Sequence, residues 1–145
     1  MRVEGDVKRQ LEQVLDFHQK FLCHIEKDPT ANPSQDVTDV RARLMQEELD
    51  EYREAVAHGD VVRVADALSD LMYVVLGTYV SHGLHCQAED LFDEVHRSNM
   101  SKLDERGQPI HRSDGKVLKS DRWSPPDLAP ILDTGARAGA RMTDG

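Results

Sequence analysis

The sequence predicts an all-α protein, a bundle of four to five helices followed by a short C-terminal hairpin or loop segment. Apolar residues recur at helical spacing in four segments, and the third of these segments is apolar around most of its circumference. A helix of that kind is typical of the middle of a bundle. The chain has 145 residues, so we expect a single domain over residues 1–133. Residues 134–145 lack apolar periodicity and are expected to form a disordered tail.

The first two helices are predicted on either side of a loop that contains two prolines. We expect the first helix from Asp6 to Lys27. Its helically spaced residues are Val7, Leu11, Val14, His18, Phe21 and Ile25. The second helix is expected to begin near Asp36 or Thr38, either of which is a suitable N-cap, and to end at the His-Gly-Asp sequence of residues 58–60.

The third helix is expected from Asp60 to about His82 and the fourth from about Gln87 to Glu105. Beyond them, residues 108–120 contain a Ser-Asp-Gly turn between two short extended runs, which is consistent with a small hairpin or an ordered loop. The proline-punctuated stretch that follows is expected to end in one helical turn.

Composition excludes several classes of protein. The formal net charge is −9, whereas a general nucleic-acid binder is usually basic. No run approaches the roughly 18 apolar residues of a membrane span, and the charged N-terminus is unlike a secretory signal. Cys23 and Cys86 lack metal-type spacing, and Asp93-x-x-His96 is the nearest match to the Glu-x-x-His pairs of a di-iron bundle. We expect a cytoplasmic protein with reduced thiols, whose partners are neither nucleic acid nor membrane.

Charge is unevenly distributed along the chain. Residues 1–96 carry 9 Lys and Arg against 20 Asp and Glu, a net charge of −11. Residues 97–122 carry 7 against 4, a net charge of +3. The acidic part could hold metal and the basic part a phosphate chain, or the two could simply neutralise each other.

The second helix places carboxylates where its pattern calls for apolar side chains. At about 100° per residue, Glu48 falls inside the apolar sector, Glu51 at its edge and Glu47 just beyond it. Burying an ionised carboxylate without a partner is costly, so a cation is expected to meet these side chains. Mg²⁺ or Mn²⁺ prefers such hard oxygen ligands. A solvated acidic patch is the alternative, and the position of Glu48 favours the metal site.

The third helix carries one polar stripe. Its members are Asp66, Asp70, Tyr73 and Gly77. Taken alone, such a stripe more often faces water. A cleft lined by Asp66 and Asp70, opposite Glu48 and Glu51, would instead complete a metal site.

Candidate substrate contacts lie on the first and fourth helices and beyond. Asn99 interrupts the predicted core stripe of Leu91, Phe92, Val95 and Leu103, and with Lys102 it could hold phosphate oxygens or serve as an ordinary interhelical amide. Four downstream cations could close over a polyphosphate or simply be solvated: Arg112, Lys116, Lys119 and Arg122. Phe17, His18 and Phe21 could stack on or hydrogen-bond a base, although phenylalanines at such positions more often pack in a core.

The sequence resembles a known superfamily. "EELDE" at residues 47–51 and "DALSD" at residues 66–70 resemble the EExxE…ExxD signature of the all-α nucleoside triphosphate pyrophosphohydrolases. That superfamily includes MazG, the phosphoribosyl-ATP pyrophosphohydrolases and the dimeric dUTPases. Residues 94–119 and "WSPPDL" at residues 123–128 resemble its MazG-like or phosphoribosyl-ATP-pyrophosphohydrolase-like branch, and the likeness extends over residues 7–133.

The resemblance implies an intertwined homodimer, which in turn could pair into a tetramer, and metal-dependent cleavage of a nucleoside triphosphate to monophosphate and pyrophosphate. It implies catalytic roles for Glu47, Glu48, Glu51 and Asp70. Of these, Glu48 and Glu51 are implied as direct ligands of Mg²⁺ or Mn²⁺, and the full set of candidate ligands is Glu47, Glu48, Glu51, Asp66 and Asp70. The resemblance also implies that Asn99 and Lys102 contact phosphate. The other candidate substrate-binding residues, taken from the pattern of the sequence, are Phe17, His18, Tyr73, Arg112, Lys116 and Lys119.

One departure from the signature matters. The Glu expected three residues before Asp70 is Ala67, and Asp66 is the nearest acid. Asp66 is expected to substitute as a ligand, or else one metal fewer is bound. We expect dUTP or another (deoxy)nucleoside triphosphate as substrate. Phosphoribosyl-ATP is the alternative substrate, and a non-catalytic nucleotide- or metal-binding dimer is the alternative from another class.

Overall fold

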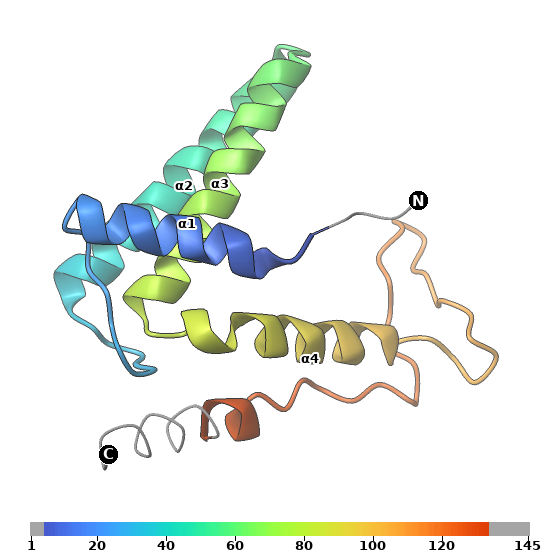
Figure 1. The fold of residues 1–145 in the computed structure, drawn as a ribbon. Coiled ribbons are helices and arrows are strands. Elements are labelled where there is room, and N and C mark those ends of the chain that lie inside the picture. The colour runs from blue at the N-terminus through green and yellow to red at the C-terminus, as the bar shows by residue number, and fades with distance from the viewer. Residues whose placement is uncertain (1–4, 134–145) are drawn as a thin grey trace. The chain divides into compact units, whose positions relative to one another are not determined.

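The structure, a computed structural model, describes residues 5–133 and is all-helical over that range, as the sequence predicts (Figure 1). The helices are α1 (Val7–Lys20), α2 (Gln35–Ala57), α3 (Val61–Ser81), the short 3-10 helix η1 (His85–Gln87) and α4 (Ala88–Met100). The chain forms two compact units, the first ending at Cys86 and the second beginning at Gln87. The predicted tail, residues 134–145, lies outside the described residues. Within the described range, no helix is both long and apolar enough to cross a membrane.

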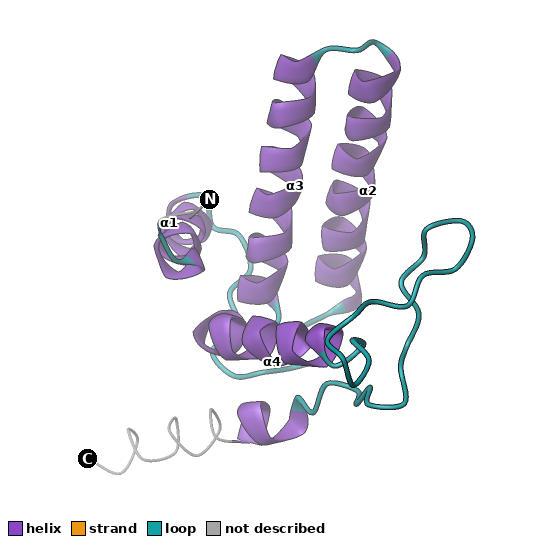
Figure 2. Cartoon of the chain, turned by 90° about the vertical axis from the view of Figure 1, so that its right-hand side faces the viewer, coloured by secondary structure: helices purple, strands orange, loops and turns teal. Residues whose placement is uncertain are grey.

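Helices α2 and α3 form an antiparallel hairpin (Figure 2). The turn between them contains Gly59, whose φ of 65° is in the left-handed region that favours glycine. Asp60 caps α3, because its side chain accepts from the backbone N–H groups of Val62 and Arg63. This end of the hairpin is as predicted. The start of α2 is not, because Ser34, rather than Asp36 or Thr38, is the N-cap.

Helix α1 ends at Lys20, well before the predicted Lys27. Leu22 then adopts a φ of 57°, and the chain turns away to run beside the C-terminal end of α3. Two backbone bonds hold it there, from Glu26 N to Val80 O and from Thr30 N to His82 O. Apolar residues recur at helical spacing as far as Ile25. The helix nevertheless ends earlier, because backbone groups beyond Lys20 form hydrogen bonds to α3 and its C-cap instead of extending α1.

The core of the first unit lies where α3 packs against α2 and α1. Its buried apolar residues are Leu11, Val14, Ala55, Ala67, Leu76 and Val80. As predicted, α3 lies in the middle of the first unit, because it packs against both α2 and α1. Its apolar surface is nevertheless not fully covered within one chain. Val61, Val62, Leu68 and Met72 are 76%, 74%, 48% and 53% exposed, so α3 retains an uncovered apolar face.

In the second unit, α4 ends at Met100 rather than at the predicted Glu105. Of its predicted core stripe, Leu91 is buried, whereas Phe92 is 69% exposed. Val95 is likewise exposed, and Leu103 is half-buried beyond the helix. The predicted hairpin is present in minimal form, as one antiparallel bridge between His111 and Val117. The predicted helical turn is also present, over residues 129–133.

Candidate active site

The structure gathers the predicted acids of α2 and α3 into one cluster. Burial raises the pKa of Glu48, and four neighbouring carboxylates raise it further through their charge. In order of effect these are Glu51, Asp70, Glu47 and Asp66. Such mutual repulsion requires proximity, because the interaction of solvent-exposed charges falls off within a Debye length. All five predicted ligands therefore lie in one region, contributed by two helices.

Glu48 is the centre of this cluster. Its Oε2 atom is shielded from solvent and has no hydrogen-bond partner among the described residues. A buried carboxylate oxygen without a partner is costly, and a hard divalent cation would satisfy it. The donor set, carboxylate oxygens alone, is the kind that Mg²⁺ and Mn²⁺ accept. The residues present thus fit a hard divalent cation.

The carboxylates are close but not converged. Within residues 5–133, no three His, Cys, Asp or Glu side chains already surround a common point at which a metal ion would sit. Glu47 instead faces Arg43, with Oε1 3.8 Å from Nε. Glu47, Glu51, Asp66 and Asp70 are exposed and have room to rotate. Repulsion between like charges keeps such side chains apart until a cation offsets it.

Ala67, at the position where the signature has Glu, is a packing residue. It is only 2% exposed, whereas its neighbour Asp66 is exposed. Asp66 is nevertheless close enough for its charge to act on Glu48. A carboxylate oxygen is therefore available beside the position that Ala67 leaves without one.

An aromatic cluster lies on the first unit, formed by Phe17, Phe21 and Tyr73. The Phe17 ring stacks on Phe21 with centroids 4.4 Å apart and meets Tyr73 edge-on at 5.7 Å. The three side chains are 36%, 67% and 41% exposed, so core packing of the phenylalanines is wrong for this chain. Exposed aromatic rings are suited to stacking on a base.

His18, predicted to contact a base, is buried, and one of its ring nitrogens forms a hydrogen bond within the fold. Its Nδ1 donates to the carbonyl of His24 over 3.0 Å. Burial lowers the pKa of His18, which favours the neutral ring. The other nitrogen, Nε2, packs against Gly77, where an added Cβ would lie 2.8 Å from it.

The predicted phosphate contacts of the second unit differ in availability. Lys102 Nζ donates to Asn99 Oδ1 over 2.7 Å, so this predicted pair meets. Arg112 is paired with Asp114, which raises the pKa of the guanidinium, and Lys119 Nζ lies 3.7 Å from the centroid of a Trp ring. Lys116 is exposed, and its ammonium has no partner among the described residues.

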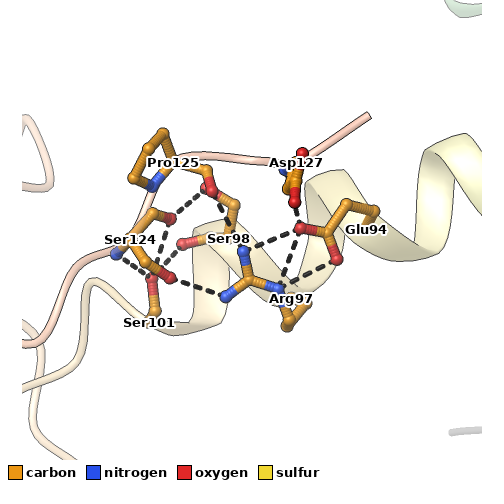
Figure 3. A network of polar contacts seen from close by, with 7 residues as sticks. All are labelled: Glu94, Arg97, Ser98, Ser101, Ser124, Pro125 and Asp127. Atoms are coloured by element: carbon orange, nitrogen blue, oxygen red, sulfur yellow. Dashed lines mark hydrogen bonds and ion pairs between the residues drawn. The ribbon is translucent and has the colours of Figure 1, made fainter. Parts of the chain in front are cut away.

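A polar network that the sequence did not predict ties the Ser-Pro-Pro-Asp segment to α4 (Figure 3). Arg97 pairs with Glu94 at 2.8 Å and donates to Ser124 Oγ and to the Pro125 carbonyl. The Glu94 carboxylate also accepts from the Asp127 N–H. The hydrogen bonds from Arg97 and Asp127 lower the pKa of Glu94 to about 2. Two serines complete the attachment, since Ser98 donates to the Ser124 carbonyl and Ser101 Oγ accepts from the Ser124 N–H.

The profile of the phosphoribosyl-ATP pyrophosphohydrolase family matches residues 14–99 of this chain. The chain belongs to this family. It is thereby a pyrophosphohydrolase of the all-α MazG-like nucleoside triphosphate pyrophosphohydrolase superfamily, as the resemblance predicts. The family match includes the five clustered acids and reaches Asn99, but it stops short of Lys102. No curated protein matches the chain significantly.

Proposed function

We propose that this protein is a metal-dependent nucleoside triphosphate pyrophosphohydrolase of the cytoplasm, which cleaves dUTP or other (deoxy)nucleoside triphosphates to monophosphate and pyrophosphate. The observation that carries the proposal is the buried Oε2 of Glu48, which has no hydrogen-bond partner within residues 5–133 and lies among four further carboxylates. Such a site in a pyrophosphohydrolase family supports binding of a metal-complexed polyphosphate.

In this proposal Glu48, Glu51 and Asp70 hold Mg²⁺ or Mn²⁺, and Asp66 supplements them. The cation, when bound, offsets phosphate charge and lowers the pKa of water. Glu47 orients or deprotonates the attacking water. Its weak pairing with Arg43, at 3.8 Å and with both side chains exposed, leaves it free to turn towards the cluster.

Charge that develops on the phosphates is stabilised by cations of the second unit. The best candidates are Lys102, positioned by Asn99, and the exposed Lys116, whose ammonium has no partner among residues 5–133. Arg112, held by Asp114, and Lys119, which lies over the ring of Trp123, make the smaller contribution. The exposed rings of the aromatic cluster form the stacking surface for the nucleobase.

Phosphoribosyl-ATP is the second candidate substrate, and the description of the matched family favours it. A non-catalytic nucleotide- or metal-binding protein is the third reading, because Ala67 removes one expected ligand. In each case we propose a homodimer, which would cover the exposed apolar face of α3. Sedimentation or light scattering at several protein concentrations would reveal a monomer if this is wrong.

The deciding experiment measures pyrophosphate release from a panel containing dUTP, the other common nucleoside triphosphates and phosphoribosyl-ATP. Each is assayed with Mg²⁺, with Mn²⁺ and with chelator. Metal-dependent release from nucleoside triphosphates supports the proposal. Release from phosphoribosyl-ATP alone selects the second candidate. No release from any of them, by folded protein that still binds Mn²⁺, contradicts catalysis and leaves a binding protein.

A further inference from the structure

Arg41 of α2 is a buried cation without an acidic partner among the described residues. Its side chain is 8% exposed. Its Nε donates to Thr78 Oγ1 over 3.2 Å, and its Nη2 donates to the Val74 carbonyl over 3.1 Å. Burial lowers the pKa of the guanidinium. Burying a charged group without an acidic partner is costly. The hydrogen bonds to the neutral oxygens of Thr78 and Val74 satisfy N–H donors of the guanidinium but do not neutralise its charge. Stabilisation by charge pairing therefore does not explain why Arg41 is held against α3.

Helix α3 is shaped to receive this guanidinium. At Gly77, an added Cβ would lie only 2.8 Å from Arg41 Nη2, so glycine is what permits the close approach. The Thr78 hydroxyl donates its own hydrogen to the Val74 carbonyl, which leaves its lone pairs to accept from Arg41. Three residues of α3 therefore contact the Arg41 side chain: Val74, Gly77 and Thr78. We call this set of three residues the seat of Arg41.

The contact between Arg41 and its seat is offset from the carboxylate cluster by the same number of residues on both helices. Arg41 precedes Glu48 by seven residues on α2, and Gly77 follows Asp70 by seven residues on the antiparallel α3. At about 1.5 Å per residue, the contact is about 10 Å along the helices from the acids. At the opposite side of the cluster, the cross-link from α3 to α2 is the exposed ion pair of Arg63 with Glu54, at 3.4 Å. An exposed ion pair of that kind stabilises little.

We propose that Arg41 is a positioning residue, which holds α2 and α3 in the register at which their carboxylates can accept a divalent cation. The five acids repel one another across these two helices, and the seated guanidinium resists the resulting displacement. A lysine could keep the charge, but it lacks the planar fork that reaches Val74 and Thr78 together. The inference rests on the metal site of the proposed function.

The test is the affinity for Mn²⁺ in the absence of nucleotide, measured on the full chain by the electron paramagnetic resonance signal of free Mn²⁺. Arg41→Lys keeps the charge near the cluster, so a change in affinity does not report lost repulsion between Arg41 and the ion. We expect its Kd for Mn²⁺ to rise about tenfold. Thr78→Val removes one acceptor while retaining Arg41, and we expect a rise of about threefold. Arg63→Lys, which alters the exposed cross-link between the same two helices, should change the Kd less than twofold.

Thermal melting separates positioning from simple loss of stability. A purely structural role would lower Tm equally with and without Mn²⁺, leaving the Mn²⁺-induced increase in Tm unchanged. The positioning role makes that increase smaller at a fixed Mn²⁺ concentration, because the increase follows the ratio of ligand concentration to Kd. If Arg41→Lys fails to fold, Thr78→Val decides the question by the same two measurements.

Folded variants that bind Mn²⁺ as tightly as the wild type would overturn the role of Arg41 and leave the metal site intact. Wild-type protein that binds no Mn²⁺ would overturn both the metal site and the positioning role. Wild-type protein that binds Mn²⁺ with the expected loss in the variants, yet releases no pyrophosphate, would overturn catalysis alone.

Discussion

Glu48 of α2 and Asp70 of α3 are acidic neighbours across the helical hairpin. Burial, the charge of Glu51 and then the charge of Asp70 raise the pKa of Glu48. One oxygen of Glu48 is moreover buried and has no hydrogen-bond partner in the part of the chain that the structure describes. Without a cation this arrangement is destabilising, and with one it becomes a binding site. The carboxylates that would bind the cation are therefore the same ones that destabilise the cation-free protein.

Glu48→Gln should abolish turnover while preserving the helices. The amide keeps the shape of the side chain but loses the charge that would hold metal, and we expect activity to fall at least about 100-fold. Circular dichroism should show unchanged helix content. Asp50→Asn is the matched control, because Asp50 is exposed on the same helix and outside the cluster. A fully active Glu48→Gln protein would rule out this site.

The raised pKa of Glu48 also predicts a pH dependence of stability. An acid whose pKa is higher in the folded than in the unfolded state makes folding less favourable as pH rises from its ordinary value, 4.5, through the folded value. The metal-free wild type should therefore lose stability relative to Glu48→Gln as pH rises above 4.5. The measurement is the difference in Tm between the two proteins from pH 4 to pH 8 in the presence of chelator. A difference that stays constant over this range would contradict the prediction.

The helical phase of the sequence indicated the unusual position of Glu48, but it did not by itself predict the carboxylate cluster. Glu48 interrupts an apolar sector, and a side chain so placed must lie where two helices meet. On α3, the polar stripe of Asp66 and Asp70 by itself indicated a solvent-facing surface, and the resemblance to the pyrophosphohydrolase signature was needed to assign Asp70 to the site. What periodicity cannot supply is the environment of each apolar face. Phe21 has helical spacing suited to a core, yet its side chain is 67% exposed in the described chain.

Contacts distant in sequence account for most of the remaining errors. Helix α1 ended early because backbone groups near Glu26 bond to the end of α3. Arg97 and Ser124 are 27 residues apart, and nothing in the local pattern of either indicates that they bond. The Ser-Pro-Pro-Asp segment was recognisable by resemblance, but its attachment to α4 depends on hydrogen bonds that only the folded chain defines.

Glu94→Ala should loosen the segment attached to α4. It removes the acceptor of the Asp127 N–H and the partner of Arg97 together. Amide hydrogen exchange at Asp127 should accelerate markedly, while exchange in α2 and α3 stays unchanged. In the wild type the protection factor at Asp127, which is the ratio of the intrinsic to the observed exchange rate, should fall on acidification from pH 4.5 towards 2, because the lowered pKa of Glu94 means that its stabilising contribution is lost only there. Asp93→Ala, a change to the exposed neighbour, is the control, and equal exchange in both variants would contradict the role of Glu94.

Two cations of the hairpin segment should differ in their effect on the reaction. Lys116 has no partner among the described residues, whereas Arg112 is held by Asp114. We expect Lys116→Met to raise KM for the triphosphate several-fold and Arg112→Met to change it less than twofold, since only the free ammonium is ready for phosphate. Steady-state kinetics at two salt concentrations would measure KM for both variants. The salt dependence of KM should decrease more in Lys116→Met than in Arg112→Met. The reverse order would show that Arg112 leaves Asp114 to bind substrate.

Gly77→Ala should destabilise the protein, although the same change normally stabilises a helix interior. Replacing a helical glycine with alanine usually gains about 1 kcal/mol. Here the new methyl group would lie 2.8 Å from both Arg41 Nη2 and His18 Nε2, two buried side chains with little room to retreat. We expect a net loss of about 1–3 kcal/mol in the free energy of unfolding, measured by urea denaturation. In the Arg41→Ala background, Gly77→Ala should lower the free energy of unfolding by less than it does in the wild type, because one of the two clashes is gone. The comparison is between the double variant Gly77→Ala/Arg41→Ala and Arg41→Ala alone. A Gly77→Ala protein more stable than the wild type would mean that the guanidinium is not seated on α3.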